Sequence, residues 1–153
     1  MDKTIVNTVA KLAQSAFVKK EVPIGAVVID AQGIIIGRGY NRIHGHKDAT
    51  EHAEVRAIKQ ATKRLRDWRL DNCQLVVNVE PCLMCLGAIA NSRIGQVTYF
   101  LADPAFGSIE SRLTLAQLKK LFPKLIIKKV VDTGETKALL QQFFKQLRSK
   151  RSS

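Results

Sequence analysis

The chain has 153 residues, of which 46% are hydrophobic, so we expect a folded core and not a disordered chain. The longest apolar run, residues 82–90, is far shorter than the roughly 20 residues that a membrane span needs. Residues 1–20 lack the continuous apolar core of a signal peptide. These features predict a cytoplasmic protein that is not associated with a membrane.

The formal net charge of +12 favours a polyanionic partner, nucleic acid before a membrane surface. Residues 119–153 alone contribute ten Lys or Arg against two acids, Asp132 and Glu135. A basic surface that is only solvated is the alternative. The chain has three cysteines, which make a poor disulfide framework and are more typical of a metal or redox site in a cytosolic protein.

In chain order, the hydrophobic pattern begins with an amphipathic helix over about residues 3–19. Two short strands, residues 26–29 and 34–40, flank the turn "DAQG" and predict a hairpin. A polar loop follows over residues 41–50. The hairpin is therefore expected to begin the sheet.

Helices and strands alternate through the rest of the chain. Helices are expected over about residues 51–65, 81–92, 113–121 and 135–148, and strands over residues 73–79, 96–101 and 124–131. The last helix is basic, and the tail "SKRSS" is expected to fray. This order predicts one α/β domain over residues 1–153, with a five-stranded mixed sheet in a three-layer α/β/α arrangement.

The stretch "TEHAEVRAIKQATK" opens a predicted helix with His52, Ala53 and Glu54. Acidic side chains stabilise a helix N-terminus, and Thr50 is a possible N-cap. Ordinary helix capping is therefore a sufficient explanation of this stretch when it is taken alone.

The stretch "EPCLMCLGA" places Cys82 and Cys85 three residues apart, on one face of the first turn of a predicted helix. The helix N-terminus favours thiolate, the form that binds metals. A redox pair, two core cysteines and a structural zinc site with four protein ligands are the alternatives. Cys73 lies within a predicted strand, and His44 and His46 lie in a loop, so none of them is a well-fixed fourth ligand.

His52 adds a third ligand to Cys82 and Cys85. Three protein ligands and a water are the catalytic zinc pattern, in which zinc lowers the pKa of the water to about 7. Glu54 lies about 200° around the helix from His52, which suits a proton shuttle better than a fourth ligand. The motif therefore predicts a catalytic metal site.

His-Ala-Glu followed by Pro-Cys-x-x-Cys is the signature of the zinc nucleobase deaminases. Within that superfamily, which has the cytidine deaminase-like fold, the chain closely resembles the bacterial tRNA-specific adenosine deaminases (the TadA family). The segments "EVPIGAVV", "GYNR", "DATEHAEVRAI", "VEPCLMCLGAI" and "NSRIGQV", within about residues 22–101, carry the resemblance in order.

The resemblance implies hydrolytic deamination of adenosine to inosine at the wobble position of a tRNA, most often an arginine tRNA. One zinc per subunit is implied, held by His52, Cys82 and Cys85. Zinc hydroxide would attack C6 of adenine, and Glu54 would shuttle the proton. Asn41, in "YNR", matches a residue that hydrogen-bonds the flipped base. The family also implies a homodimer in which both subunits contact the tRNA.

One loop departs from the family pattern, and the role of two aromatic residues in the last helix has two possible explanations. In the loop over residues 103–111, Glu110 replaces a glycine, which would lower the stability of the fold if the backbone there needs a positive φ. A carboxylate at this position would also repel RNA phosphate. In the last helix, Phe143 and Phe144 are either RNA contacts or core residues.

Two other functions compete with a tRNA deaminase. A deaminase of a free nucleobase or nucleoside, of the guanine or cytosine type, would use the same zinc and Glu54 but has no use for a net charge of +12. A zinc-stabilised RNA-binding domain without activity would keep the ligands but has no need for Glu54.

Overall fold

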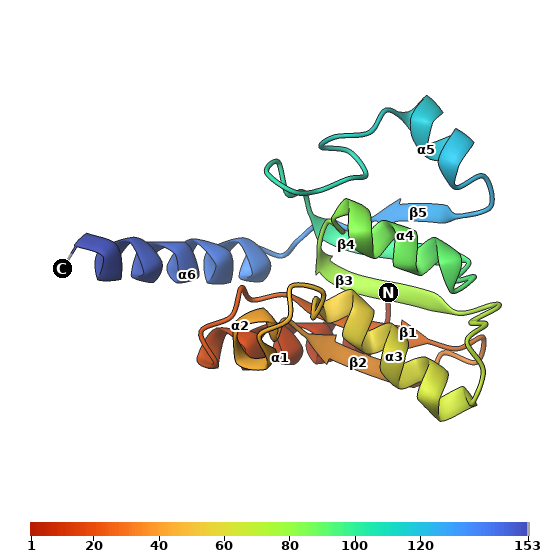
Figure 1. Ribbon diagram of the computed structural model, residues 1–153, viewed down its shortest axis with the longest axis horizontal. Helices are drawn as coiled ribbons and strands as arrows, with labels where there is room; N and C mark the ends of the chain where they lie inside the picture. Colours follow the sequence, from red (N-terminus) through yellow and green to blue (C-terminus); the bar gives the residue numbers. More distant parts are fainter. Residues whose placement is uncertain (153) are drawn as a thin grey trace.

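The computed structural model describes residues 1–152 and contains one five-stranded sheet in the order β2-β1-β3-β4-β5 (Figure 1). The strands are β1 (Gly25–Ile29), β2 (Ile35–Tyr40), β3 (Gln74–Val79), β4 (Gln96–Leu101) and β5 (Ile126–Lys129). β1 pairs antiparallel with β2 and β3, whereas β3, β4 and β5 are parallel. The predicted five-stranded mixed sheet is confirmed.

The helices are α1 (Lys3–Val18), α2 (Ile43–His46), α3 (Ala53–Leu65), α4 (Leu83–Asn91), α5 (Leu115–Leu121) and α6 (Glu135–Ser152). Five of them match predicted helices. α2 lies in the segment expected to be a polar loop. α6 continues to Ser152, where fraying was expected; its last turn contains Lys150 and Arg151, which are good helix formers. None of the described helices is long and apolar enough to cross a membrane.

Side chains of α3, α4 and α5 share one core cluster with one face of the sheet. α3 lies unusually close to β2 because Gly37 and Gly39 face it. A Cβ on Gly39 would lie 2.2 Å from the carbonyl oxygen of Ala53, and one on Gly37 would lie 2.2 Å from that of Ala57. These glycines set how closely the N-terminus of α3 approaches the sheet, and so they help to position His52 and Glu54.

The opposite face of the sheet packs against α1, through Ile5 and Val9 on the helix and Val27, Val76 and Phe100 on the strands. Helices therefore cover both faces, as the predicted three-layer arrangement requires. Figure 1 shows that α3, α4, the segment after β4 and α6 all begin at the same end of the sheet.

α6 projects beyond that end and contacts α1 and β4 (Figure 1). The ring of Phe143 packs edge-on against Phe17 of α1, with 6.4 Å between the centroids. Phe144 is 42% exposed. Phe143 is thus a partly buried packing residue, whereas the ring of Phe144 is exposed to solvent.

Candidate active site

His52 and Cys82 occupy the N-cap positions of α3 and α4, the extended residues directly before each helix. Neither side chain caps its own helix. The ordinary capping explanation is also wrong for Thr50, whose backbone N–H and hydroxyl both donate to Asp48. Because neither side chain caps its helix, the imidazole of His52 and the thiol of Cys82 are free to face each other between the two helix N-termini.

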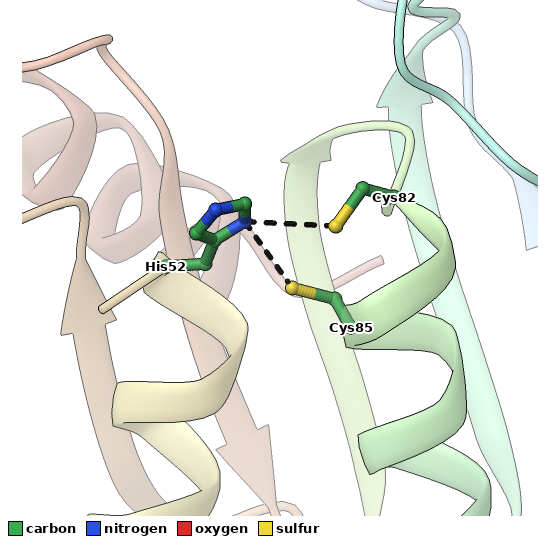
Figure 2. A group of neighbouring side chains, drawn as sticks. All are labelled: His52, Cys82 and Cys85. Atoms are coloured by element: carbon green, nitrogen blue, oxygen red, sulfur yellow. Dashed lines mark hydrogen bonds between the residues drawn. The ribbon is translucent and has the colours of Figure 1, made fainter. Parts of the chain in front are cut away.

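His52, Cys82 and Cys85 converge on one point (Figure 2). The Nδ1 atom of His52 lies 3.6 Å from Sγ of Cys82 and 3.5 Å from Sγ of Cys85. Tetrahedral zinc with bonds of about 2.1 Å to nitrogen and 2.3 Å to sulfur would set its ligand atoms about 3.6 to 3.8 Å apart. The three side chains therefore fit a zinc ion in both donor chemistry and spacing.

The described residues place no further His, Cys, Asp or Glu in this group of three. Cys73 is buried in the core, and His44 and His46 are exposed on α2. A structural site with four protein ligands is accordingly not formed by residues 1–152. Three protein ligands are the pattern of catalytic zinc sites.

The candidate ligand side chains share protons with one another, and only the pKa shift of Cys82 favours the form that binds a metal. A hydrogen bond from the Cys85 thiol, and a weaker effect of His52, hold the pKa of Cys82 far below its ordinary value although burial opposes this. The same hydrogen bond, with burial, raises the pKa of Cys85. The hydrogen bond to Cys82 raises the pKa of His52. A bound metal would replace these shared protons, so its affinity should increase with pH.

Glu54 is 3% exposed and follows His52 by two residues on α3. Its Oε2 atom accepts a hydrogen bond of 3.3 Å from Sγ of Cys85. Burial raises the pKa of the Glu54 carboxyl above its ordinary value. A carboxyl group with a raised pKa next to the candidate metal ligands is suited to accept and return a proton near neutral pH.

Asn41 lies directly beside this group and is 3% exposed. Its Oδ1 atom accepts a 2.8 Å hydrogen bond from the backbone N–H of Ala53, at the start of α3. Glu21, 1% exposed, similarly accepts from the backbone N–H of His44 at 2.8 Å. Both side chains thus anchor the segment that leads into α3, a role that the sequence did not reveal.

Sequence reasoning also missed Glu80, a 3% exposed carboxylate between β3 and Cys82. It accepts five hydrogen bonds from the segment after β4. Its partners are the backbone N–H groups of Asp103 (3.0 Å), Ile109 (2.8 Å), Glu110 (2.9 Å) and Ser111 (3.1 Å) and the hydroxyl of Ser111 (2.6 Å). The only signal in the sequence was an acid directly before the Pro-Cys pair.

Gly107 fits under this carboxylate because it has no side chain; a Cβ there would lie 2.3 Å from the carboxyl carbon of Glu80. The backbone of Glu110 does not have a positive φ, so replacing glycine with glutamate at this position does not strain the backbone. Its carboxylate accepts from the Tyr99 hydroxyl at 2.8 Å and pairs with Lys129 at 2.7 Å. The negative charge is thus turned toward the sheet and neutralised there.

Comparison with known proteins agrees with this geometry. The profile of the MafB19-like deaminase family matches residues 1–148. The tRNA-specific adenosine deaminase of Aquifex aeolicus is 37% identical over 137 residues, which cover 90% of this chain and 89% of that protein. The tRNA(Ile)-lysidine synthase of Deinococcus radiodurans is 47% identical over 98 residues, 64% of this chain but 17% of that longer protein.

Among solved structures, one described for A-to-I editing by tRNA:A34 deaminases at the wobble position of transfer RNA superposes with a TM-score of 0.82. It is 31% identical in sequence, and the match covers 91% of this chain and all of that one. The chain therefore belongs to the deaminase family, and within it to the group of the tRNA-specific adenosine deaminases.

Proposed function

We propose that this deaminase converts adenosine to inosine by hydrolysis at the first anticodon position of a tRNA. The observation that carries the proposal is the convergence of His52, Cys82 and Cys85 beside the buried carboxyl of Glu54. The similarity to tRNA-specific adenosine deaminases along nearly the whole chain supports the choice of base and of RNA.

In this proposal His52, Cys82 and Cys85 hold one zinc ion per chain, which supplies an activated water near neutral pH. Glu54 would take one proton of the water and pass it to the purine ring. After the hydroxyl has added to C6, Glu54 would take the proton of that new hydroxyl group and give it to the amino group, which leaves as ammonia. The Oδ1 atom of Asn41 already accepts from Ala53, so its amide N–H group is the part that would donate to the base.

A tRNA partner is supported by the charge of the chain and by the surface next to the site. The net charge is +12. A hollow of about 460 Å³ lies between the end of β4 and α6, and its lining includes Lys137, Phe144 and Arg148. Cationic side chains with an exposed aromatic ring suit the phosphates and bases of an RNA strand. An arginine tRNA in the cytoplasm is the proposed physiological substrate.

We also propose a homodimer that forms through α4. Leu83 and Met84 on this helix are 60% and 39% exposed, and a Cβ on Gly87 would meet no atom within 4 Å. A second copy would bury this apolar surface in an interface that is the same on both chains. Met84→Glu should shift the sedimentation behaviour from dimer to monomer, and an unchanged dimer would exclude this interface.

The proposal is tested by incubating the enzyme with a transcribed arginine tRNA that carries A at the first anticodon position. Inosine is read by sequencing, with free adenosine, cytidine and guanine as parallel substrates. Inosine at that position alone supports the proposal. Ammonia from a free base, without inosine in the tRNA, would identify a nucleobase or nucleoside deaminase instead. RNA binding without any deamination would identify a binding domain.

A further inference from the structure

The segment between β4 and α5 holds one aromatic ring in solvent beside the candidate site. Phe106 is 69% exposed, more than the exposed aromatic residues Trp68 at 58% and Phe144 at 42%. Apolar rings of this size normally gain stability by burial, so an exposed ring needs another explanation. One explanation is a flexible loop tip, and the other is a surface that a partner covers.

Hydrogen bonds argue against a flexible tip. Glu80 accepts from four backbone N–H groups of this segment and from one hydroxyl. Asp103 accepts from the backbone N–H groups of Ala105 at 3.1 Å and Phe106 at 3.3 Å. Arg112 donates to the carbonyl oxygen of Ala105. The backbone on both sides of the ring is thus held in one conformation.

The same guanidinium lies over the aromatic ring. The Cζ atom of Arg112 is 6.0 Å from the centroid of the Phe106 ring, a cation–π arrangement. Arg112 therefore helps to orient the ring and also places a positive charge next to it. A flat apolar surface with an adjacent cation matches the chemistry of a nucleotide, which has a base to stack and a phosphate to neutralise.

This surface lies close to the metal ligands. Gly107, the next residue, forms an antiparallel bridge with Cys82. Ser108 donates two hydrogen bonds of 2.9 Å to the carbonyl oxygen of Pro81, one from its backbone N–H and one from its hydroxyl. The bridge and one further residue separate the Cα atoms of Cys82 and Phe106 by at most about 10 Å. A nucleotide next to the reacting base is within reach of the ring.

We infer that the Phe106 ring, with Arg112 over it, is the platform on which the nucleotide next to the target adenosine stacks. The inference rests on the proposed function, because it requires an RNA substrate. An enzyme that acts on a base within a strand must take that base out of the stack, so its neighbours lose a stacking partner. The phenyl ring replaces that partner and makes Phe106 a specificity-determining residue for the RNA.

The test compares kcat/KM for a short anticodon stem–loop RNA among the unaltered enzyme and its variants. Stacking on an aromatic side chain predicts that Phe106→Leu lowers kcat/KM by about 5- to 150-fold, mainly through KM. Phe106→Trp, which keeps a flat ring, should restore the value to within about 3-fold of the unaltered enzyme. Trp68→Leu, which removes an exposed aromatic residue beyond the other end of α3, is the matched control and should change little.

A second readout follows stacking directly. A 2-aminopurine placed beside the target adenosine should lose fluorescence on binding to the unaltered enzyme and keep it with Phe106→Leu. Unchanged kcat/KM and unchanged quenching in Phe106→Leu would overturn the inference and leave the proposed function intact. No inosine from the unaltered enzyme with any RNA would overturn the proposed function, and the inference with it.

Discussion

Replacement of Glu80 tests how the segment beside the candidate metal ligands is held in place. Glu80→Ala removes the acceptor of five hydrogen bonds from a side chain that is 3% exposed. Hydrogen bonds to charged groups are worth about 1.5–3 kcal/mol each, but they are not additive. Four of these donors are only partly buried, so water replaces some of the loss. We expect the free energy of unfolding to fall by about 3–5 kcal/mol.

Glu80→Gln keeps the shape of the side chain, so we expect it to lower the free energy of unfolding by less than Glu80→Ala does. The Oε2 atom accepts from three backbone N–H groups, and an amide oxygen in that place would keep all three bonds. The amide nitrogen would then face the N–H of Asp103, while the Ser111 hydroxyl can turn to accept. One opposed donor pair should cost about 1–2 kcal/mol.

Urea unfolding at a fixed excess of zinc measures both variants, since a bound ligand shifts the apparent stability. Hydrogen exchange of the Ile109 amide, which donates to Glu80 at 2.8 Å, reports on the segment itself. A loss below about 1 kcal/mol in Glu80→Ala, or equal losses in the two variants, would refute this account of the carboxylate.

Gly107→Ala should destabilise the fold by about 2 kcal/mol or more in urea unfolding, because its Cβ would lie 2.3 Å from a carboxyl carbon. Gly95→Ala, whose Cβ would meet its nearest atom at 3.8 Å, is the control, and equal effects would contradict the steric argument. Cys82→Ser should abolish stoichiometric zinc in the purified protein, whereas Cys73→Ser should retain it; a zinc-loaded Cys82→Ser would exclude the site. In Glu110→Gln, the stability lost relative to the unaltered protein should be less than about 1 kcal/mol near pH 7, because the pair with Lys129 is exposed. Since the hydrogen bond from Lys129 lowers the pKa of Glu110 below 4.5, that difference should vanish as the pH falls through the lowered value, and a difference that persists at low pH would contradict it.

The sequence was sufficient for the positions of the strands along the chain and for the choice of His52, Cys82 and Cys85 as candidate ligands, because the hydrophobic runs and the paired motifs can be read directly from it. Hydrophobic runs marked every strand, and the spacing of Cys82 and Cys85 together with His52 indicated the group of three side chains that the structure brings together. The helix starts were placed about two residues too early: α3 begins at Ala53 and α4 at Leu83. His52 and Cys82 are extended cap residues, and a periodicity cannot separate a cap from a first turn.

What the sequence did not reveal depends on contacts between distant segments. The partners of Glu80 lie 23 to 31 positions away, and most of them are backbone N–H groups that no residue pattern displays. The backbone conformation of Glu110 likewise could not be predicted from the glycine that the family pattern has at this position. α2 was missed because its four residues, Ile43–His46, are too few for a helical period and include a glycine.

The central claim is that His52, Cys82 and Cys85 hold the metal and that Glu54 moves the proton. Zinc content and inosine yield, measured side by side in the unaltered protein and in Glu54→Gln, test it most directly. The account predicts one zinc per chain in both proteins and at least about 100-fold less inosine from Glu54→Gln. Undiminished inosine from zinc-loaded Glu54→Gln would contradict the role of Glu54, and loss of zinc from this variant would contradict the three-ligand site.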